Sequence, residues 1–350
     1  MNVKSEEQIL NASLPSDIFV MDEDTIERQY EEYMERFKPT DYNTIRNFVI
    51  TQKITLLYRK ALKQLGSKEY DMGQYNLVIT DEDNNTLSFE ADYVYDIKLG
   101  KMYVTEENII FLVNKKHKKY YENYIAKTTK IPKLNKDIWS RTQYSFPNVT
   151  KHFKTIEGDY AIIVTKPCKI YPLREILNYF GGKLHHEHVA AIVNRLYYFE
   201  CYMDIIGMQH NGITVDNLFF APGRVVEEGE SFTVDDMRIV GVFGGWFFTT
   251  SVDEKKTGMP KEVYESLPEK LRTQKYSSFE VDEHAIKRVA RELLGDASGE
   301  NLGDTPEPIK KWLNDPNIKR NAFNEYVFWE DVMHESYGKR RFVDMNISIK

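Results

Sequence analysis

The chain has 350 residues, of which 41% are hydrophobic and 29% are charged, and its formal net charge is −7. This length and composition allow two or three domains with sizeable cores. The modest excess of acidic residues argues against a dedicated nucleic-acid-binding protein, which would carry a basic face.

The two cysteines, Cys168 and Cys201, make neither a disulfide framework nor a zinc-site spacing. We therefore expect a reduced, cytoplasmic protein. Residues 1–14 are expected to be a polar leader, without the apolar segment of a signal peptide. No run approaches the roughly 18 apolar residues of a membrane span, so no membrane contact is expected.

A helical hairpin is predicted over residues 15–68. Its first helix, near 25–37, repeats apolar residues at helical spacing. Lys38-Pro39 ends this helix because the residue before a proline avoids helical backbone angles. The second helix is expected near 44–65, before Gly66. The two helices are expected to pack antiparallel through Tyr30, Met34, Phe48 and Leu57.

A β-rich region follows, in which apolar and polar residues alternate. Asp83-Asn84-Asn85 has the composition of a hairpin turn. The segment from Lys115 to Lys136 is basic and polar, with one helical turn or more expected around 120–125, and a helix is expected near 135–144. The expected strands are 75–80, 86–95, 98–105, 109–113 and 160–165.

Helices dominate the second half of the chain. The longest, 186–206, is apolar on nearly every side and is expected in the core. A strand pair is expected at 218–221 and 238–242. This order predicts a two-lobed α+β fold, with a β-rich lobe over 70–166, an α-rich lobe over 167–350 and a ligand cleft between them. The other helices are expected at 173–179, 282–294, 306–313 and 321–335.

The segment 209–220 resembles the catalytic loop of protein kinases, H-R-D-x-x-x-x-N followed by an apolar strand. His210 takes the position of the histidine and Asn217 that of the metal-binding asparagine. Gly212 stands where the catalytic aspartate would be, and Thr214 stands where serine/threonine kinases carry a lysine.

Further kinase-like motifs follow in the expected order. Val242-Phe243-Gly244 resembles D-F-G, with Val242 in place of the metal-binding aspartate. Leu267-Pro268-Glu269 resembles A-P-E, and Asp282 lies where the central helix of the kinase C-lobe begins. Asp315-Pro316 with Arg320 resembles D-P-x-x-R, one residue longer. The resemblance implies a buried structural ion pair between Glu269 and Arg320.

The upstream part of the resemblance is weaker in its motifs and reaches back to about residue 90. Phe146-Pro147-Asn148-Val149 resembles the H-P-N-I that follows helix αC, which places Asp137 at the position of the αC glutamate. The glycine-rich loop is reduced to one glycine, Gly100. Leu112 stands where the phosphate-binding lysine is expected, and Lys115 and Lys116 are the alternatives.

The N-terminal hairpin resembles the core of a J-domain, a family that stimulates its chaperone partner through H-P-D in the turn. Here the triplet is Lys38-Pro39-Thr40, which keeps only the proline. The alternative is an ordinary helical hairpin that decorates the kinase-like part.

Several residues also have purely structural interpretations. His210 is expected to pack and hydrogen-bond rather than to carry protons, and Asn217 caps the loop or binds a metal. His185-His186-Glu187-His188 lacks the i, i+4 zinc spacing and is expected to be a solvated helix start with no metal. Lys115–Lys119 is expected to be a solvated face, with a polyanion-binding patch as the alternative.

The function that we expect depends on two carboxylates that the kinase-like motifs lack. Phosphoryl transfer in this fold needs one carboxylate to orient the substrate hydroxyl and another to hold magnesium. Gly212 and Val242 supply neither. The resemblance therefore implies a pseudokinase, a catalytically inactive scaffold, adaptor or decoy whose partner is another protein, such as a kinase or a chaperone.

No cofactor is expected, although weak ATP binding could use Asn217, Asp216 and Asp137. The first alternative is an atypical nucleotide-dependent transferase, either a kinase or a nucleotidyltransferase. In that case Asp216, beside Asn217, would be the one carboxylate able to substitute. The second alternative is a chaperone-linked adaptor that acts through the J-like hairpin.

Overall fold

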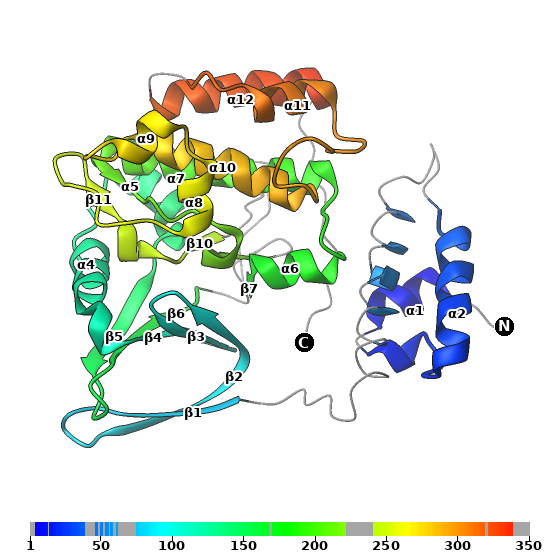
Figure 1. Ribbon diagram of the computed structural model, residues 1–350, viewed down its shortest axis with the longest axis horizontal. Coiled ribbons are helices and arrows are strands. Elements are labelled where there is room, and N and C mark those ends of the chain that lie inside the picture. The colour runs from blue at the N-terminus through cyan, green and yellow to red at the C-terminus, as the bar shows by residue number, and fades with distance from the viewer. Residues whose placement is uncertain are drawn as a thin grey trace.

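The computed structural model describes residues 4–12, 14–38, 75–167, 170–221, 241–318 and 321–338, together with positions 46, 47, 50, 51, 53–55, 57, 58 and 61. These residues form a β-rich lobe, a helical lobe and a small N-terminal helical module (Figure 1). The two-lobed α+β fold predicted from the sequence is confirmed.

One antiparallel sheet makes the β-rich lobe, with strand order β1-β2-β3-β4-β6-β5. Its first two hairpins turn at Asn84 (φ 63°) and Gly100 (φ 154°). A Cβ at Gly100 would lie 1.9 Å from the carbonyl oxygen of Leu112, so only glycine fits this turn. The strands are β1 (Tyr75–Thr80), β2 (Thr86–Ile97), β3 (Gly100–Thr105), β4 (Asn108–Val113), β5 (Asn148–Lys154) and β6 (Tyr160–Thr165).

The sheet curls, and its two faces meet different cores (Figure 1). Side chains alternate along β4 as they must in a strand. Ile109, Phe111 and Val113 face the main core, which extends into the helical lobe. Ile110 packs with Leu77 in a small second core. Two helices, α4 (Lys118–Thr128) and α5 (Lys136–Thr142), connect β4 to β5.

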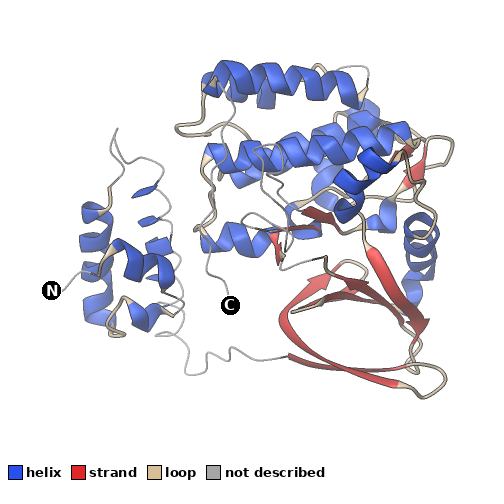
Figure 2. Cartoon of the chain, turned by 180° about the vertical axis from the view of Figure 1, so that it is seen from behind, coloured by secondary structure: helices blue, strands red, loops and turns tan. Residues whose placement is uncertain are grey.

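The helical lobe is built around α7 (His186–Ile205), which is buried over most of its surface. It packs against α10 (Phe279–Leu293) and α12 (Ala322–Tyr337), and Figure 2 shows the helices layered on one side of the sheet. The other helices are α6 (Leu173–Tyr179), α8 (Lys261–Ser266), α9 (Glu269–Thr273) and α11 (Glu307–Asn314). Two small sheets contain β7 (Tyr171–Pro172), β9 (Leu218–Phe220) and β10 (Gly241–Phe243), and β8 (Met208–Gln209) with β11 (Thr250–Ser251).

The N-terminal module contains α1 (Glu6–Asn11), α2 (Glu23–Arg36) and helical positions between 46 and 61. Its own hydrophobic core includes Ile26 and Leu57, and the rings of Tyr30 and Tyr58 stack at 4.1 Å. The module touches the helical lobe at α6, where Lys53 Nζ lies 3.8 Å above the ring of Tyr179. The predicted packing through Phe48 falls outside the described residues.

Several elements were not predicted from the sequence. Residues 6–11 of the expected polar leader form α1, which begins with a capping box at Ser5 and buries Ile9 in the module core. β5, α8 and α9 were also not predicted. The basic segment, where one helical turn or more was expected, contains α4, a helix of about three turns. In the part of the chain that the structure describes, no helix has both the length and the apolarity to cross a membrane.

Candidate functional site

A buried carboxylate on α10 fixes the backbone of the candidate catalytic loop. Asp282, fully buried, accepts hydrogen bonds from the backbone N–H groups of His210 (2.6 Å) and Asn211 (2.7 Å). Asn211 has a left-handed backbone (φ 58°), and its side chain donates to the carbonyl of Phe248 and the hydroxyl of Thr250. Burial raises the pKa of Asp282 to about 7, against the effect of the two N–H donors. Hydrogen bonds to buried groups therefore fix the loop on the side that faces the core.

His210 lies in the core beneath the loop. Its ring is completely buried and meets Phe199 and Trp246 edge-on, at centroid distances of 5.7 and 5.4 Å. Nδ1 accepts a hydrogen bond from the N–H of Gly212 at 3.2 Å. Burial lowers the pKa of His210 to about 3, so the imidazole is neutral at physiological pH. This environment fits the structural interpretation of this residue.

Asn217 is surrounded by residues without side chains. Its amide nitrogen donates to the carbonyl of Gly212 at 2.9 Å, and its own carbonyl accepts from the N–H of Gly244 at 2.6 Å. A Cβ at Gly244 would lie 2.9 Å from the Asn217 carbonyl oxygen, and one at Gly245 would lie 2.6 Å from the side-chain nitrogen. The close packing of Asn217 leaves no room for an acidic side chain at either glycine.

The residues that resemble D-F-G lie on and after β10. Val242 pairs with Phe219 and Phe243 pairs with Leu218 on β9, so the chain reaches Asn217 only at Gly244. From 242 to 245 the sequence is Val-Phe-Gly-Gly. No side chain in this stretch carries an oxygen that could hold a metal ion.

Asp216 forms an ion pair with Arg174, which lies outside the loop. Its carboxylate lies 2.7 Å from Nε of Arg174 on α6, and the same guanidinium contacts Glu292 on α10 at 2.7 Å. Arg288 contacts the other oxygen of Glu292 at 2.7 Å. The contact with Arg174 therefore turns Asp216 toward α6. Sequence reasoning placed Asp216 next to Asn217 but gave no signal for this network.

An aromatic cluster occupies the place where β4 meets α4 and the segment after β10. Phe111, Tyr124 and Phe247 pack with ring centroids 4.8–5.7 Å apart. Tyr124 is fully buried, its hydroxyl has no hydrogen-bond partner among the described residues, and burial raises its pKa. Asn123 of α4 donates to the carbonyls of Phe247 and Thr249 at 3.1 and 2.9 Å.

This arrangement bears on the predicted phosphate-binding lysine and its acidic partner. Leu112 packs on the opposite face of the sheet from Phe111, so it is not the β4 residue that faces the helical lobe. The helix that contacts the segment after β10 is α4, whereas Asp137 belongs to α5 and its side chain lies outside the described part. Lys115 and Lys116 are exposed at the start of the helical connection.

Two tyrosines of β2 reach across to the helical lobe. The hydroxyl of Tyr95 donates to Glu175 on α6 at 2.7 Å. Tyr93 lies beside it with a ring-centroid distance of 6.4 Å. Burial, followed by the nearby Glu175 carboxylate, raises the pKa of both phenols above the usual range. β2 and α6 are thus joined directly by protein side chains.

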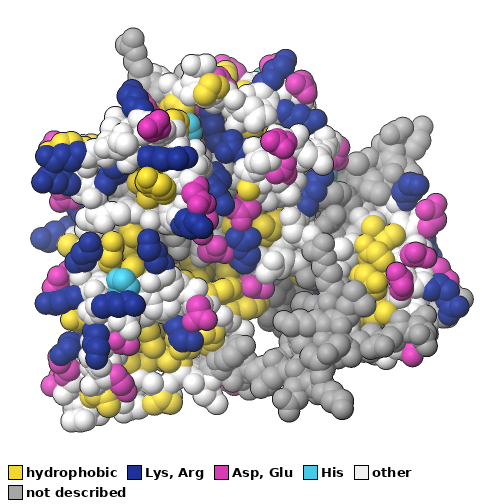
Figure 3. Space-filling view, in the orientation of Figure 1, with side chains coloured by type: hydrophobic (Ala, Val, Ile, Leu, Met, Phe, Trp, Pro, Cys, Tyr) yellow, Lys and Arg dark blue, Asp and Glu magenta, His cyan; other side chains and the backbone are white. Residues whose placement is uncertain are grey.

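Other predicted residues are placed as follows. Glu269 is exposed in the first turn of α9, and its expected partner Arg320 lies outside the described residues, so the ion pair stays a prediction. Lys38 is exposed and lies 4.0 Å from Glu35, while Pro39 and Thr40 are outside the described part. Lys115–Lys119 is a solvated face except for half-exposed His117; basic and acidic side chains are interspersed on the face seen in Figure 3.

The histidine-rich start of α7 differs from its prediction. His185 and His188 are 2% and 1% exposed, so this segment is not a solvated helix start. The backbone N–H of Leu184 bonds to the carbonyl of Leu293, which draws the start of α7 against α10. The sequence gave no signal for this contact because it joins residues about a hundred positions apart.

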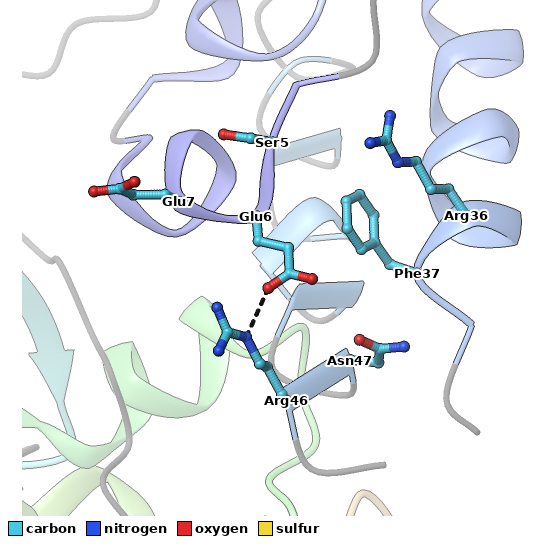
Figure 4. A pocket seen from close by; sticks show the side chains of 7 residues that line it. All are labelled: Ser5, Glu6, Glu7, Arg36, Phe37, Arg46 and Asn47. Atoms are coloured by element: carbon cyan, nitrogen blue, oxygen red, sulfur yellow. Dashed lines mark ion pairs between the residues drawn. The ribbon is translucent and has the colours of Figure 1, made fainter. Parts of the chain in front are cut away.

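A separate hollow of about 540 Å³ lies in the N-terminal module (Figure 4). It is polar, and an ion pair between Glu6 and Arg46 at 2.7 Å crosses it. Its lining is Ser5, Glu6, Glu7, Arg36, Phe37, Arg46 and Asn47. The hollow lies at the end of α2, where Arg36 and Phe37 line it.

Sheet order, helical lobe and the loop held by Asp282 together define a protein-kinase-like fold. No protein-family model and no curated protein matches the sequence. Among solved structures, vaccinia related kinase 3 is 13% identical, with 74% of this chain and 90% of that chain covered and a TM-score of 0.49. A Plasmodium kinase domain is 14% identical, with 59% and 63% covered and a TM-score of 0.43. Identities this low say nothing about activity.

Proposed function

We propose that this protein is a catalytically inactive kinase-like protein, a pseudokinase, that acts as a scaffold, adaptor or decoy for another protein. The observation that carries the proposal is the surroundings of Asn217. The neighbouring positions Gly212, Gly244 and Gly245 have no side chains, and Val242 is apolar. The loop keeps a kinase-like shape but presents no carboxylate at the positions that phosphoryl transfer requires.

The loss affects two separate parts of the reaction. A positioned general base contributes about 10²–10⁴-fold to the rate, and Gly212 cannot act as one. Metal ions bridge the phosphates and neutralise the developing charge. Without a carboxylate between residues 242 and 245, Asn217 alone would have to hold the ion. Turnover by the ordinary mechanism is therefore expected to be negligible.

Contacts between the lobes support the same proposal. Tyr95 of β2 bonds to Glu175 of α6, and the cluster of Phe111, Tyr124 and Phe247 occupies the inner side of β4. These contacts use apolar surface and a hydroxyl where a kinase would use charged groups. They stabilise one relative position of the lobes, which suits a protein that presents a fixed surface to a partner.

One observation favours the alternative of an atypical transferase, either a kinase or a nucleotidyltransferase. Asp282 holds the loop backbone in order, so Asn217 and Asp216 are presented reproducibly to the solvent side. Asp216 would have to leave Arg174, to which it is bound at 2.7 Å, before it could act on a nucleotide.

The chaperone-linked alternative rests on the N-terminal module. Its helices pack as a hairpin through Ile26, Tyr33 and Leu57, and Lys38 is exposed at the end of α2. The triplet lacks both the histidine and the aspartate of H-P-D. We therefore expect the full chain to leave the ATPase rate of an Hsp70-type chaperone unchanged, and clear stimulation would favour this alternative.

The test of the main proposal is ATP binding and label transfer by the full chain. Calorimetric titration with ATP is run with magnesium, with manganese and with a chelator, beside an active kinase as positive control. Radiolabelled ATP, labelled at the γ or the α position, then reports autophosphorylation or nucleotidylation. We expect weak, metal-independent binding and no transfer of either label.

The decisive variants are Asn217→Ala and Asp216→Ala. If tight magnesium-dependent binding and label transfer occur and either substitution abolishes them, the pseudokinase proposal is wrong and the transferase takes its place. Asp331→Ala, an exposed substitution on α12, serves as the matched control.

A further inference from the structure

Three side chains able to bind metal ions meet at the start of α7, outside the cleft between the lobes. His186 is the first residue of α7, and His185 is the residue before it. Asp304 comes from the loop before α11. Each offers one ligand atom, and the three atoms all lie within 4.8 Å of one another. Residues far apart in sequence thus supply two nitrogens and one oxygen to a single point.

The three candidate metal ligands differ in their exposure to solvent. His185 is 2% exposed, His186 is half-buried and Asp304 is exposed. The imidazole rings of His185 and His186 lie 4.0 Å apart. Two nitrogen ligands would therefore sit against the protein, with the carboxylate at the solvent edge. An ion could enter from solvent and keep one coordination position for water.

The chemical types of the three ligands suit a divalent transition metal. Two imidazoles and a carboxylate match the preference of zinc and related divalent transition metals.

His186 also has an outer partner. Its Nδ1 lies 2.7 Å from the hydroxyl of Tyr337 at the end of α12, and the two rings stack at 5.6 Å. If Nδ1 carries the proton and donates it to this hydroxyl, Nε2 is the nitrogen that would bind an ion. Such outer hydrogen bonds commonly orient metal-binding histidines and fix their tautomer.

Two existing contacts compete with an ion. Lys183 Nζ lies 3.3 Å from the Asp304 carboxylate, so a divalent ion would displace this ammonium. His185 Nδ1 accepts a long hydrogen bond, 3.4 Å, from the N–H of Glu187. This bond is lost whichever ring nitrogen binds the ion, because binding through Nε2 moves the proton to Nδ1. Tetrahedral zinc with bonds of about 2.0–2.2 Å places its ligands about 3.4 Å apart, so the atoms must close by roughly 1.5 Å or less.

We propose that His185, His186 and Asp304 form a binding site for a divalent transition-metal ion of the zinc type, completed by water. The bound ion would link the start of α7 to the loop before α11 and, through Tyr337, to the end of α12. It would stabilise the helical lobe on the side away from the sheet. This site is independent of the proposed lack of kinase activity.

The test uses the full chain, freed of metal with a chelator and titrated with zinc chloride in a calorimeter. We expect one equivalent of zinc to bind and to raise the unfolding temperature. Asp304→Asn and His186→Ala should each weaken binding at least 10-fold. Tyr337→Phe keeps the stacked ring but removes the hydroxyl, and it should weaken binding about 10-fold.

Lys183→Met is the most informative variant. Removing the competing ammonium should tighten zinc binding, while all three metal ligands stay in place. His152→Ala, which removes an exposed histidine of β5 in the other lobe, should change nothing. Circular dichroism at 25 °C establishes that each variant is folded; if His186→Ala is not, Asp304→Asn at the solvent edge decides. Absence of zinc binding, or equal affinity in all variants, overturns the proposal.

Discussion

A buried charged group in the helical lobe allows the packing to be tested quantitatively. Lys287 on α10 is 2% exposed, and its ammonium lies 3.9 Å from Glu283 and 3.6 Å from Glu325, both 0% exposed. The ammonium also donates to the carbonyl of Asp315 at 3.1 Å. Tyr197 donates to Glu283 at 2.8 Å. The ammonium of Lys287 therefore lies near two fully buried carboxyl groups.

The perturbation is Lys287→Met, which keeps the length and packing of the side chain but removes the charge. Removing one partner of a buried ion pair costs about 3–5 kcal/mol, because the remaining charge is left uncompensated. The carboxyls can escape part of this cost by binding protons. Burial, followed by the nearby Glu325, already raises the pKa of Glu283 to about 8. Loss of the ammonium would raise it further.

The sign of the pH dependence follows from this direction. A carboxyl whose pKa is higher in the folded state than in the unfolded chain makes the fold less stable as pH rises between the two values. For Glu283 that window runs from about 4.3, the reference value for glutamate, to about 8. Within this window both chains lose stability at the same rate per pH unit, but in the variant the window extends above pH 8. The difference from the natural chain should therefore be smallest at pH 5.5 and should grow above pH 8 toward about 3–5 kcal/mol.

The assay is urea denaturation followed by circular dichroism at pH 5.5, 8 and about 9.5, the last chosen to lie above the folded pKa of Glu283. Lys311→Met, an exposed lysine on α11, is the matched control and should stay within about 0.5 kcal/mol of the natural chain. The double variant Lys287→Met with Glu283→Gln should recover part of the loss at the highest pH. A loss below about 1 kcal/mol at the highest pH, or the same loss at every pH, would refute the reasoning.

Three further predictions concern the β-rich lobe and its contacts, each measured as a change in unfolding free energy. Tyr124→Phe removes a buried hydroxyl that has no partner among the described residues, so it should be neutral or stabilising by up to about 1 kcal/mol; a clear loss would mean that the hydroxyl is bonded. Tyr95→Phe should cost about 1–3 kcal/mol because Glu175 loses its donor, and should increase hydrogen exchange in β2. Gly100→Ala should cost more than about 3 kcal/mol, since its Cβ would clash with a backbone carbonyl, whereas Gly338→Ala, with nothing within 4 Å, should cost only the strain of its positive φ, about 1–3 kcal/mol.

Strands and helices with a strong apolar pattern were predictable from the sequence. Residues 160–165 and 186–206 were assigned correctly because they are buried along their whole length and carry almost continuous apolar residues. β5, Asn148–Lys154, was missed for the opposite reason. It lies at the edge of the sheet, most of its side chains face solvent, and its composition is polar. A strand of this kind is specified by its hydrogen bonds to β6, which leave no pattern in the sequence.

The face on which a buried strand residue lies was not predictable. In β4 both faces are apolar, since Ile110 and Leu112 meet one core and Ile109 and Phe111 meet the other. Alternation therefore carries no information on which residue points at the helical lobe. Leu112, expected at the lysine position, lies on the face that meets the smaller core, and the sequence pattern could not show this. A one-residue shift reverses every side chain of a strand.

Long-range polar contacts were likewise invisible in the sequence. Arg174 and Asp216 are 42 positions apart, and their ion pair depends on how α6 packs beside the loop. His185 and His188, at the start of α7, are buried because this segment contacts α10. By contrast, the spacing of the kinase-like motifs did draw attention to Asp282, which lies in the first turn of α10 and bonds to the candidate catalytic loop.

The contacts of Asp282 show how a kinase-like loop can be held in place without the carboxylates that kinase chemistry requires. The two hydrogen bonds go to backbone N–H groups, so they hold the loop whatever side chains it carries. His210 packs beneath the loop as a neutral ring, and its Nδ1 accepts from the N–H of Gly212. Positions 212 and 242, where the resemblance places the two carboxylates, take no part in the bonds of Asp282. In this chain they are Gly212 and Val242, and Gly244 and Gly245 approach Asn217 closely. The anchor at Asp282 therefore does not depend on the side chains at 212 and 242, and a scaffold of this fold would still require it.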